Sequence, residues 1–422
     1  MVGGPVGQTA PMRNVRGVTV GLVTLALLAA CSGADDGGSA DADGGATEDV
    51  AESAAVEPEL FGEGDGDFYA VPDPLPAGEH GDLLRYQEMA SSSPEFASWR
   101  IMYLSESLQG EPIAVTGFAL VPTTPTPAEG RTAVAVAHGT TGIADECAPS
   151  KEPGVYGNVA AVSGEVKPVL AFSDFEGLGT PGRHPYLVGE SEGRGTLDAL
   201  KASRQLPDAE IGDRYAIWGY SQGGHAAMFA HQLAAEWGPD DMDLVGTVAG
   251  APATEMSVIF QAAGSQPGIA GFLYMIIAGF EAAYPEADPS LLLTPAGLDL
   301  LDAVDEGCGG ALAGAAARPP DELLLPGYTE AEPWPELMEA NNPGEVATDD
   351  PLLILHSAAD DLVPAALSQI TFDRLCGLGQ VVERRVYEDG KGHGAAATDA
   401  AVDGFAWIDD LFNGAEPIST CP

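Results

Sequence analysis

The segment 219–223 reads GYSQG, which places Ser221 between two glycines in the order G-x-S-x-G. The apolar run 215–219 precedes the serine, and a segment of helical character, 224–237, follows it. A serine on a tight strand-to-helix turn projects its hydroxyl beyond the sheet edge, and glycines permit that turn because they lack a Cβ. The pattern predicts that Ser221 is a nucleophile.

A serine hydroxyl near neutral pH needs a base, and the base needs a carboxylate that orients it. With this kind of turn the expected chain order is serine, acid, histidine. Only His356 and His393, of seven histidines, lie well after Ser221. His356 ends the apolar run 352–356 and is expected to be a buried strand-end residue. His393 follows a glycine-rich stretch before the last predicted helix, so we predict that it is the general base.

The acid is expected in the segment HSAADDLVP, 356–364, directly after that apolar run. Asp360 fits the pattern D-x-x-V-P, and its neighbour Asp361 is the alternative. Two backbone N–H groups should receive the charge of the oxyanion. One is predicted on Gln222, just after the nucleophile, and the other on Thr140, in the loop HGTTG at 138–142.

The elements that would position these residues alternate between strand and helix, which predicts an α/β fold with a mostly parallel central sheet flanked by helices. Expected strands are 100–105, 113–121, 134–137, 169–172, 215–219, 244–249, 352–356 and 381–387. Expected helices are 190–204, 224–237, 364–375 and 396–411.

About residues 251–349 interrupt this alternation, because they contain apolar, helix-like segments and no clear strand. We interpret them as a helical cap inserted between two sheet strands. The alternative is that they are core helices of a larger sheet.

The N-terminus has the features of an export signal. Arg13 and Arg16 precede the apolar run 18–30, which is shorter than the roughly 20 residues of a membrane span. The run ends LAAC, with small residues before Cys31, as in the lipobox of bacterial lipoproteins. We predict a lipoprotein signal peptide at 1–30, a lipidated Cys31 that anchors an acidic disordered tether at 31–67, and a folded domain at 68–422. An ordinary secretory signal is the alternative.

The charge is strongly negative: 17 basic residues stand against 64 acidic ones, a net charge of −47. Such a surface repels nucleic acid, so no nucleic-acid partner is expected. No cysteine or histidine spacing indicates a metal site. Besides Cys31, the chain has four cysteines, an even number that suggests two disulfides in an exported protein, with three possible pairings, or else free buried thiols. These cysteines are Cys147, Cys308, Cys376 and Cys421.

Together, the segments AHGTTG, SDFEGLGTPGRHPYL, WGYSQGG and HSAADDLVP, with GHG near the C-terminus, resemble the secretory lipase family of α/β-hydrolases, which occurs in fungi and actinobacteria. The likeness covers about residues 85–421. It implies hydrolysis of carboxylic esters, often triacylglycerols, with a helical lid and without metal or cofactor. It also implies the disulfide pairs Cys147–Cys308 and Cys376–Cys421. The anchor signal and the acidic surface depart from a typical secreted member.

The sequence therefore predicts a serine ester hydrolase or lipase, with an ester or lipid substrate, that works outside the cytoplasm through an acyl-enzyme. Its membrane contact would be the N-terminal lipid anchor. An acyltransferase or a peptidase on the same fold is the first alternative. A cell-surface binding protein on an inactive scaffold is the second, and the complete set of Ser221, Asp360 and His393 argues against it.

Overall fold

The computed structural model describes residues 56–62, 64–91, 93–152, 154, 157–164, 166–266, 269–308 and 318–422. The predicted signal peptide, Cys31 and most of the predicted tether lie outside these residues. Within the described part of the chain, no helix combines the length and the hydropathy that crossing a bilayer requires.

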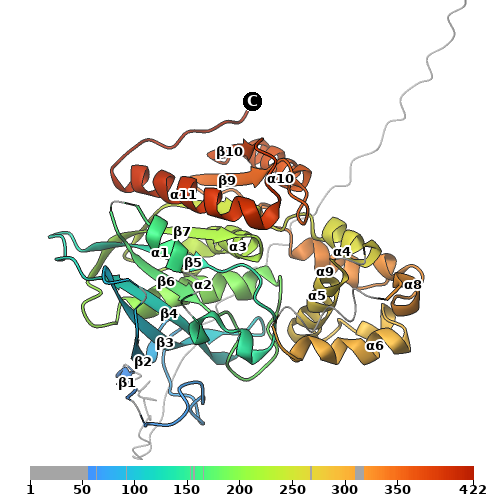
Figure 1. Ribbon diagram of the computed structural model, residues 1–422, viewed down its shortest axis with the longest axis horizontal. Coiled ribbons are helices and arrows are strands. Elements are labelled where there is room, and N and C mark those ends of the chain that lie inside the picture. Colours follow the sequence, from blue (N-terminus) through green and yellow to red (C-terminus); the bar gives the residue numbers. More distant parts are fainter. Residues whose placement is uncertain are drawn as a thin grey trace, which may run out of the picture. The chain divides into compact units, whose positions relative to one another are not determined.

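Ten strands form a single sheet in the order β1-β2-β3-β4-β6-β5-β7-β8-β9-β10 (Figure 1). In this order, neighbouring strands from β2 to β6 are antiparallel. Neighbouring strands from β6 to β10 are parallel. The strands are β1 Glu59–Leu60, β2 Leu83–Met89, β3 Phe96–Glu106, β4 Pro112–Pro122, β5 Arg131–Ala137, β6 Val169–Ser173, β7 Ile211–Tyr220, β8 Asp243–Gly250, β9 Leu352–Ser357 and β10 Val382–Tyr387.

The central strands are apolar because helices cover both faces of the sheet. Successive residues of β5 show this directly: Val134 and Val136 belong to the core on one face, and Ala133 and Ala135 to the core on the other. The first core lies under α11 (His393–Phe412), which α1 (Gly157–Val162) also contacts. The expected α/β architecture is confirmed.

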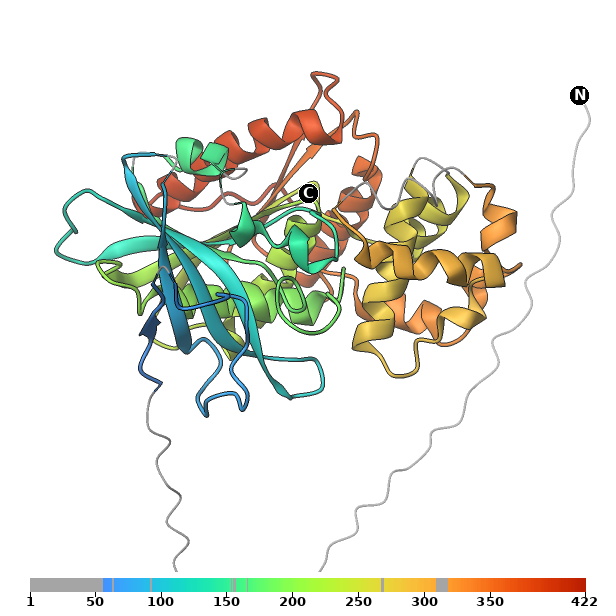
Figure 2. The ribbon, with the colours of Figure 1, turned by 60° about the horizontal axis from the view of Figure 1, so that its bottom comes forward.

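The opposite face of the sheet is covered by three helices, α2 (Gly189–Ser203), α3 (Gln222–Trp237) and α10 (Ala365–Leu378). Figure 2 shows α11, in red, on the other side of the strands from the green helices α2 and α3. The sequence analysis did not predict β1, β2 or α1. The other sheet strands and the flanking helices all overlap predicted elements.

Between β8 and β9 the described residues form helices and turns, with one isolated bridge between Leu293 and Leu324. We call residues 251–349 the cap. Its core includes Phe260, Phe280 and Trp334, whose rings stack. The elements of the cap are α4 Met256–Ser265, α5 Ala270–Ala283, η5 Pro289–Leu291, α6 Pro295–Leu301, η6 Asp302–Asp305, α8 Pro320–Leu323, η7 Tyr328–Glu330 and α9 Trp334–Ala340.

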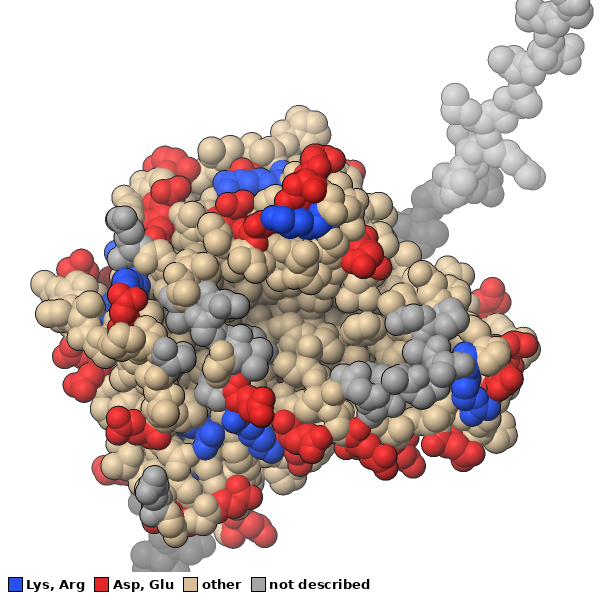
Figure 3. All heavy atoms as spheres, in the orientation of Figure 1, with Lys and Arg blue, Asp and Glu red and all other residues tan. Residues whose placement is uncertain are grey.

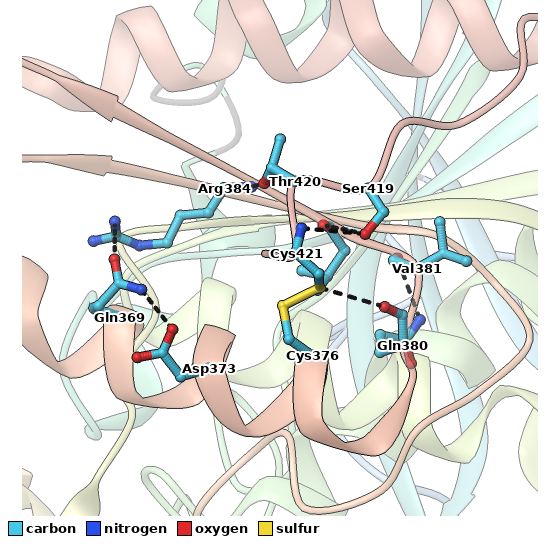
Figure 4. The surroundings of a disulfide bond; sticks show 10 residues. Gln369, Asp373, Cys376, Gln380, Val381, Arg384, Ser419, Thr420 and Cys421 are labelled. Atoms are coloured by element: carbon cyan, nitrogen blue, oxygen red, sulfur yellow. Dashed lines mark hydrogen bonds between the residues drawn. A yellow bond between two sulfur atoms is a disulfide. The ribbon is translucent and has the colours of Figure 1, made fainter.

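Both disulfides join segments that are distant in the sequence. Cys147, at the end of the short turn η1 (Asp145–Cys147), pairs with Cys308 of the cap, and Cys376 of α10 pairs with Cys421. The turn η2 (Pro149–Lys151) follows η1. Figure 4 shows the second disulfide holding the C-terminal segment beside β10, where the N–H of Thr420 donates to the carbonyl of Val382. These are the pairs that the resemblance implies.

The folded part of the chain begins earlier than the predicted boundary at residue 68. β1 pairs with β2, and Phe61 is buried together with Phe68 against Leu84 and Met102. The composition of 31–67 is acidic on average, but Phe61 finds an apolar site on the outer strands of the sheet. The last part of the predicted tether therefore belongs to the domain.

Candidate active site

Ser221 stands between the last residue of β7 and the first residue of α3, with φ 61° and ψ −120°. A non-glycine residue in this region is strained, and such strain persists where the surrounding structure enforces it. A Cβ at Gly219 would overlap the carbonyl oxygen of Gly223, and a Cβ at Gly223 would overlap that of Ala137. The two glycines are required by these close approaches, as the motif predicts.

The structure brings Ser221 and His393 into contact across 172 positions of sequence, because α11 begins at His393 beside the end of β7. The imidazole Nε2 lies 2.8 Å from Ser221 Oγ, and Nδ1 lies 2.7 Å from Asp360 Oδ2. Each ring nitrogen of His393 therefore contacts one of the other two residues. The three residues form the chain of contacts that general-base activation of a serine requires.

Asp360 and Asp361 have different partners, which decides between the two candidate acids. Asp360 faces the imidazole of His393, whereas Asp361 accepts the backbone N–H of His393 through Oδ1, at 2.9 Å. Asp361 therefore contacts the same residue without touching its ring. The structure supports the preference for Asp360 and gives Asp361 a separate contact in the loop.

The side chain of Asp360 is shielded from solvent and well supplied with donors. Its Oδ1 accepts the N–H groups of Leu362 and Val363, at 2.9 and 2.8 Å. Burial raises the pKa of this carboxyl, but hydrogen bonds from His356 and His393 lower it by more, so the pKa lies well below its usual value. Asp360 is thus held ionised beside His393.

Gln222 directly follows the nucleophile, and the loop that carries Thr140 lies beside it. Gln222 is the first residue of α3, and the N–H groups of the first turn of a helix have no partner within the helix. The loop 138–142 packs against the elbow, since a Cβ at Gly139 would lie 3.9 Å from Ser221 Cβ. Thr140 in this loop is held by a 2.8 Å contact between its Oγ1 and the hydroxyl of Tyr186.

Beside Ser221 lies a cavity whose walls are almost wholly apolar. The main domain contributes Leu362 and Val363 from the acid loop, and the cap contributes Ile259, Phe272 and Ile276. Figure 3 shows one face of the molecule, with acidic residues around its margin and uncharged residues in a hollow at its centre. The nucleophile therefore opens onto an apolar space that the cap helps to form.

The sequence analysis missed Glu192 and Tyr186, which lie immediately behind the proposed oxyanion donors. Glu192 is fully buried and accepts a hydrogen bond from the side chain of Gln222. Tyr186 contacts Thr140. The only sequence clue was position: Tyr186 falls in the segment 173–187, which carries the family resemblance, and Glu192 follows it closely.

Among the described residues, no group of three or more His, Cys, Asp or Glu side chains is arranged as a metal site.

A ten-stranded, mostly parallel sheet with a serine on a strained turn after a parallel strand is the architecture of an α/β-hydrolase. The fold of Candida antarctica lipase A in its closed state matches it with a TM-score of 0.71 and 18% identity, over 85% of this chain and 88% of that one. This likeness shows the fold.

The sequence comparisons agree with the family resemblance. The family model for secretory lipases matches residues 168–315. Lipase 1 of Candida albicans is 24% identical over 391 residues, and a secreted triacylglycerol lipase of Malassezia globosa is 22% identical over 384 residues. Each alignment covers 84% of this chain and 82% of the relative. The resemblance to the secretory lipase family of α/β-hydrolases is confirmed.

Proposed function

We propose that this protein is a serine ester hydrolase of the lipase type that works through Ser221, His393 and Asp360. The observation that carries the proposal is the contact of His393 with both other residues, 2.8 Å to Ser221 Oγ and 2.7 Å to Asp360 Oδ2. The secretory lipase family model and the lipase relatives support ester hydrolysis as the reaction.

In the first half of the reaction, Ser221 Oγ attacks the ester carbonyl while Nε2 of His393 takes its proton. The ionised Asp360 stabilises the imidazolium that forms. The backbone N–H groups of Gln222 and Thr140 receive the negative charge of the tetrahedral intermediate. The intermediate then expels the alcohol, which takes the proton from His393, and leaves an ester on Ser221.

In the second half, His393 takes a proton from water, which attacks the acyl group on Ser221. The tetrahedral intermediate collapses, the proton returns from His393 to Ser221, and the carboxylic acid leaves. Every proton in this cycle passes through Nε2 of His393, so the cycle needs only the three side chains and the two backbone donors.

The apolar cavity supports esters with an apolar acyl chain as the substrate class, triacylglycerols among them. Ile259, Phe272 and Ile276 of the cap would contact the acyl chain and exclude water from the acyl-enzyme. The similarity to the secreted triacylglycerol lipase of Malassezia globosa supports the same class.

Two disulfides favour an oxidising compartment, which supports action outside the cytoplasm. We further propose that Cys31 carries the lipid that anchors the protein. Growth with a labelled fatty acid, followed by isolation of the protein and of a Cys31→Ser variant, tests this. Label should appear in the first protein and be missing from the second.

Covalent labelling tests the mechanism. A serine-directed organophosphonate should add to Ser221 and stop hydrolysis of p-nitrophenyl esters. Ser221→Ala should be neither labelled nor active while its melting temperature stays close to that of the wild type. Turnover by the folded Ser221→Ala protein would contradict the proposal.

A further inference from the structure

Glu192, in α2, is a carboxylate with no exposed surface that lies behind the nucleophile. Its Oε1 accepts the backbone N–H of Leu187 at 3.0 Å and the side-chain Nε2 of Gln222 at 2.8 Å. Its Oε2 faces Nδ1 of His225 at 2.9 Å. Burying a carboxylate costs free energy unless hydrogen bonds or ion pairs replace its contacts with water. Glu192 therefore depends on these three partners.

His225 is the partner of the second carboxylate oxygen of Glu192. Both ring nitrogens face acceptors: Nδ1 faces Glu192, and Nε2 lies 3.0 Å from the carbonyl oxygen of Asn341. Both contacts are fully buried, so they fix the orientation of the ring. His225 thereby joins Glu192 to the cap, because Asn341 directly follows α9.

The first proposed oxyanion donor is fixed through the side chain of Gln222. Its Nε2 donates to Glu192 and also lies 2.9 Å from Nε2 of His184. Nδ1 of His184 donates to the carbonyl of Glu176 at 2.9 Å, so its Nε2 is free to accept. Because burial lowers the pKa of His184 to about 4, the ring is neutral and can play this part. Both amide hydrogens of Gln222 are therefore held.

Glu192 is linked to the second proposed donor, Thr140, through the segment that precedes α2. Leu187 has φ 57°, a strained conformation for leucine, and its N–H is held by Glu192. The preceding residue, Tyr186, places its hydroxyl 2.8 Å from Oγ1 of Thr140. One carboxylate thus supports the residues on which both donors depend.

We propose that Glu192 is a positioning residue for the reaction, which holds Gln222 directly and Thr140 through Leu187 and Tyr186 in the geometry that receives the oxyanion. This inference rests on the proposed function. It assigns a kinetic role to a side chain that has no contact with the nucleophile, and it predicts a defect in turnover separate from any defect in stability.

The test uses two substitutions on the same helix. Glu192→Gln replaces a buried carboxylate by an amide of the same shape. Asp198→Asn is the matched control, because Asp198 is equally buried in α2 but contacts His80, Ser105 and Trp237 instead. Both variants should melt at lower temperature. Only Glu192→Gln should lower kcat, by about tenfold or more, with KM for a soluble p-nitrophenyl ester changed less than about threefold.

A second variant keeps the test decisive if Glu192→Gln does not fold. Gln222→Ala retains the backbone N–H and removes only the side chain that Glu192 holds. Its kcat should fall whether or not Glu192→Gln folds. Where Glu192→Gln does fold, combining the two substitutions should lower kcat by less than the product of the two single effects. Wild-type kcat in folded Gln222→Ala, or fully multiplicative effects in the double variant, would overturn the inference.

Phosphonate labelling distinguishes a failure of the proposed function from a failure of the proposed role of Glu192. Wild-type protein that is not labelled at Ser221 would overturn the proposed function itself. Wild-type protein that is labelled, together with a Glu192→Gln variant of normal kcat and a reduced melting temperature, would leave the function standing and show Glu192 to be purely structural. If the inference is right, the rate of labelling falls in Glu192→Gln and not in Asp198→Asn.

Discussion

Nε2 of His356 lies 3.4 Å from Oδ2 of Asp360, the same oxygen that faces Nδ1 of His393. His356 is buried, and its Nε2 also lies 2.8 Å from the carbonyl of Val363, while Nδ1 contacts Ser368. Two imidazoles therefore meet one carboxylate from different sides. This explains why a residue expected only to end a strand contributes to the ionised state of Asp360.

The two neighbouring aspartates should respond differently to the same change. Asp360→Asn removes the carboxylate that orients and stabilises the imidazolium, so kcat should fall by about 10³–10⁴-fold. Asp361→Asn keeps an oxygen for the N–H of His393 and should lose less than about tenfold. Steady-state hydrolysis of a p-nitrophenyl ester measures both, and a larger loss in Asp361→Asn would reverse the assignment of the acid.

The stability of the fold should depend on pH through His231. Burial lowers the pKa of His231 to about 4, against about 6.5 in an unfolded chain. Between these values the unfolded state binds a proton that the folded state does not, so stability falls as pH falls from 6.5 to 4. The loss amounts to at most about 3 kcal/mol.

A variant isolates this contribution from other titrating groups. His231 contacts Thr247 and Thr348, and His231→Asn keeps a polar side chain that does not titrate. The difference in free energy of unfolding between wild type and variant should shrink as pH falls from 6.5 to 4, by denaturant unfolding at each pH. A difference that is constant over this range would contradict the assignment.

The two disulfides should differ in their contribution to stability. Cys147 and Cys308 are 161 positions apart, whereas Cys376 and Cys421 are 45 apart. Because a longer closed loop restricts the unfolded chain more, replacing the first pair by serines should cost about 1 kcal/mol more than replacing the second. Denaturant unfolding of the two double variants compares them, and an equal or reversed order would show that native contacts outweigh loop length.

The cavity should set the length of acyl chain that the protein accepts. Ala262 in α4 lines the cavity and is partly exposed, so Ala262→Phe adds a ring to the wall without filling the core of the cap. The ratio of kcat/KM for a p-nitrophenyl palmitate to that for a butyrate should fall about tenfold. Val402→Phe, an exposed site on α11, is the control and should leave the ratio unchanged.

Local sequence patterns predicted most of the elements and the residues of the elbow. The run before Ser221 is apolar because the end of β7 is buried. Gly219 is required by the carbonyl of Gly223 in the same turn, and Gly223 by the carbonyl of Ala137 at the end of the neighbouring strand β5. β2 was missed because its residues LLRYQEM lack both strict alternation and a continuous apolar run. Its partner β3 decides its conformation.

The sequence identified Asp360 and Asp361 as the two candidate acids. The contacts that distinguish them are made by His393, 32 or 33 positions further along the chain. The position of His356 beside Asp360 has the same origin. Glu192 had no sequence pattern of its own, because its three partners come from the segment before α2 and from the first turn of α3.

The amino-acid sequence by itself determined the alternation of strands and helices, the strained turn at Ser221 and the order of the reactive residues along the chain. Only the tertiary structure decided which carboxylates meet which imidazoles and which cap side chains face the serine. The physical reason is range: backbone conformation and burial pattern follow from near neighbours, whereas hydrogen bonds between buried polar groups depend on how whole elements pack.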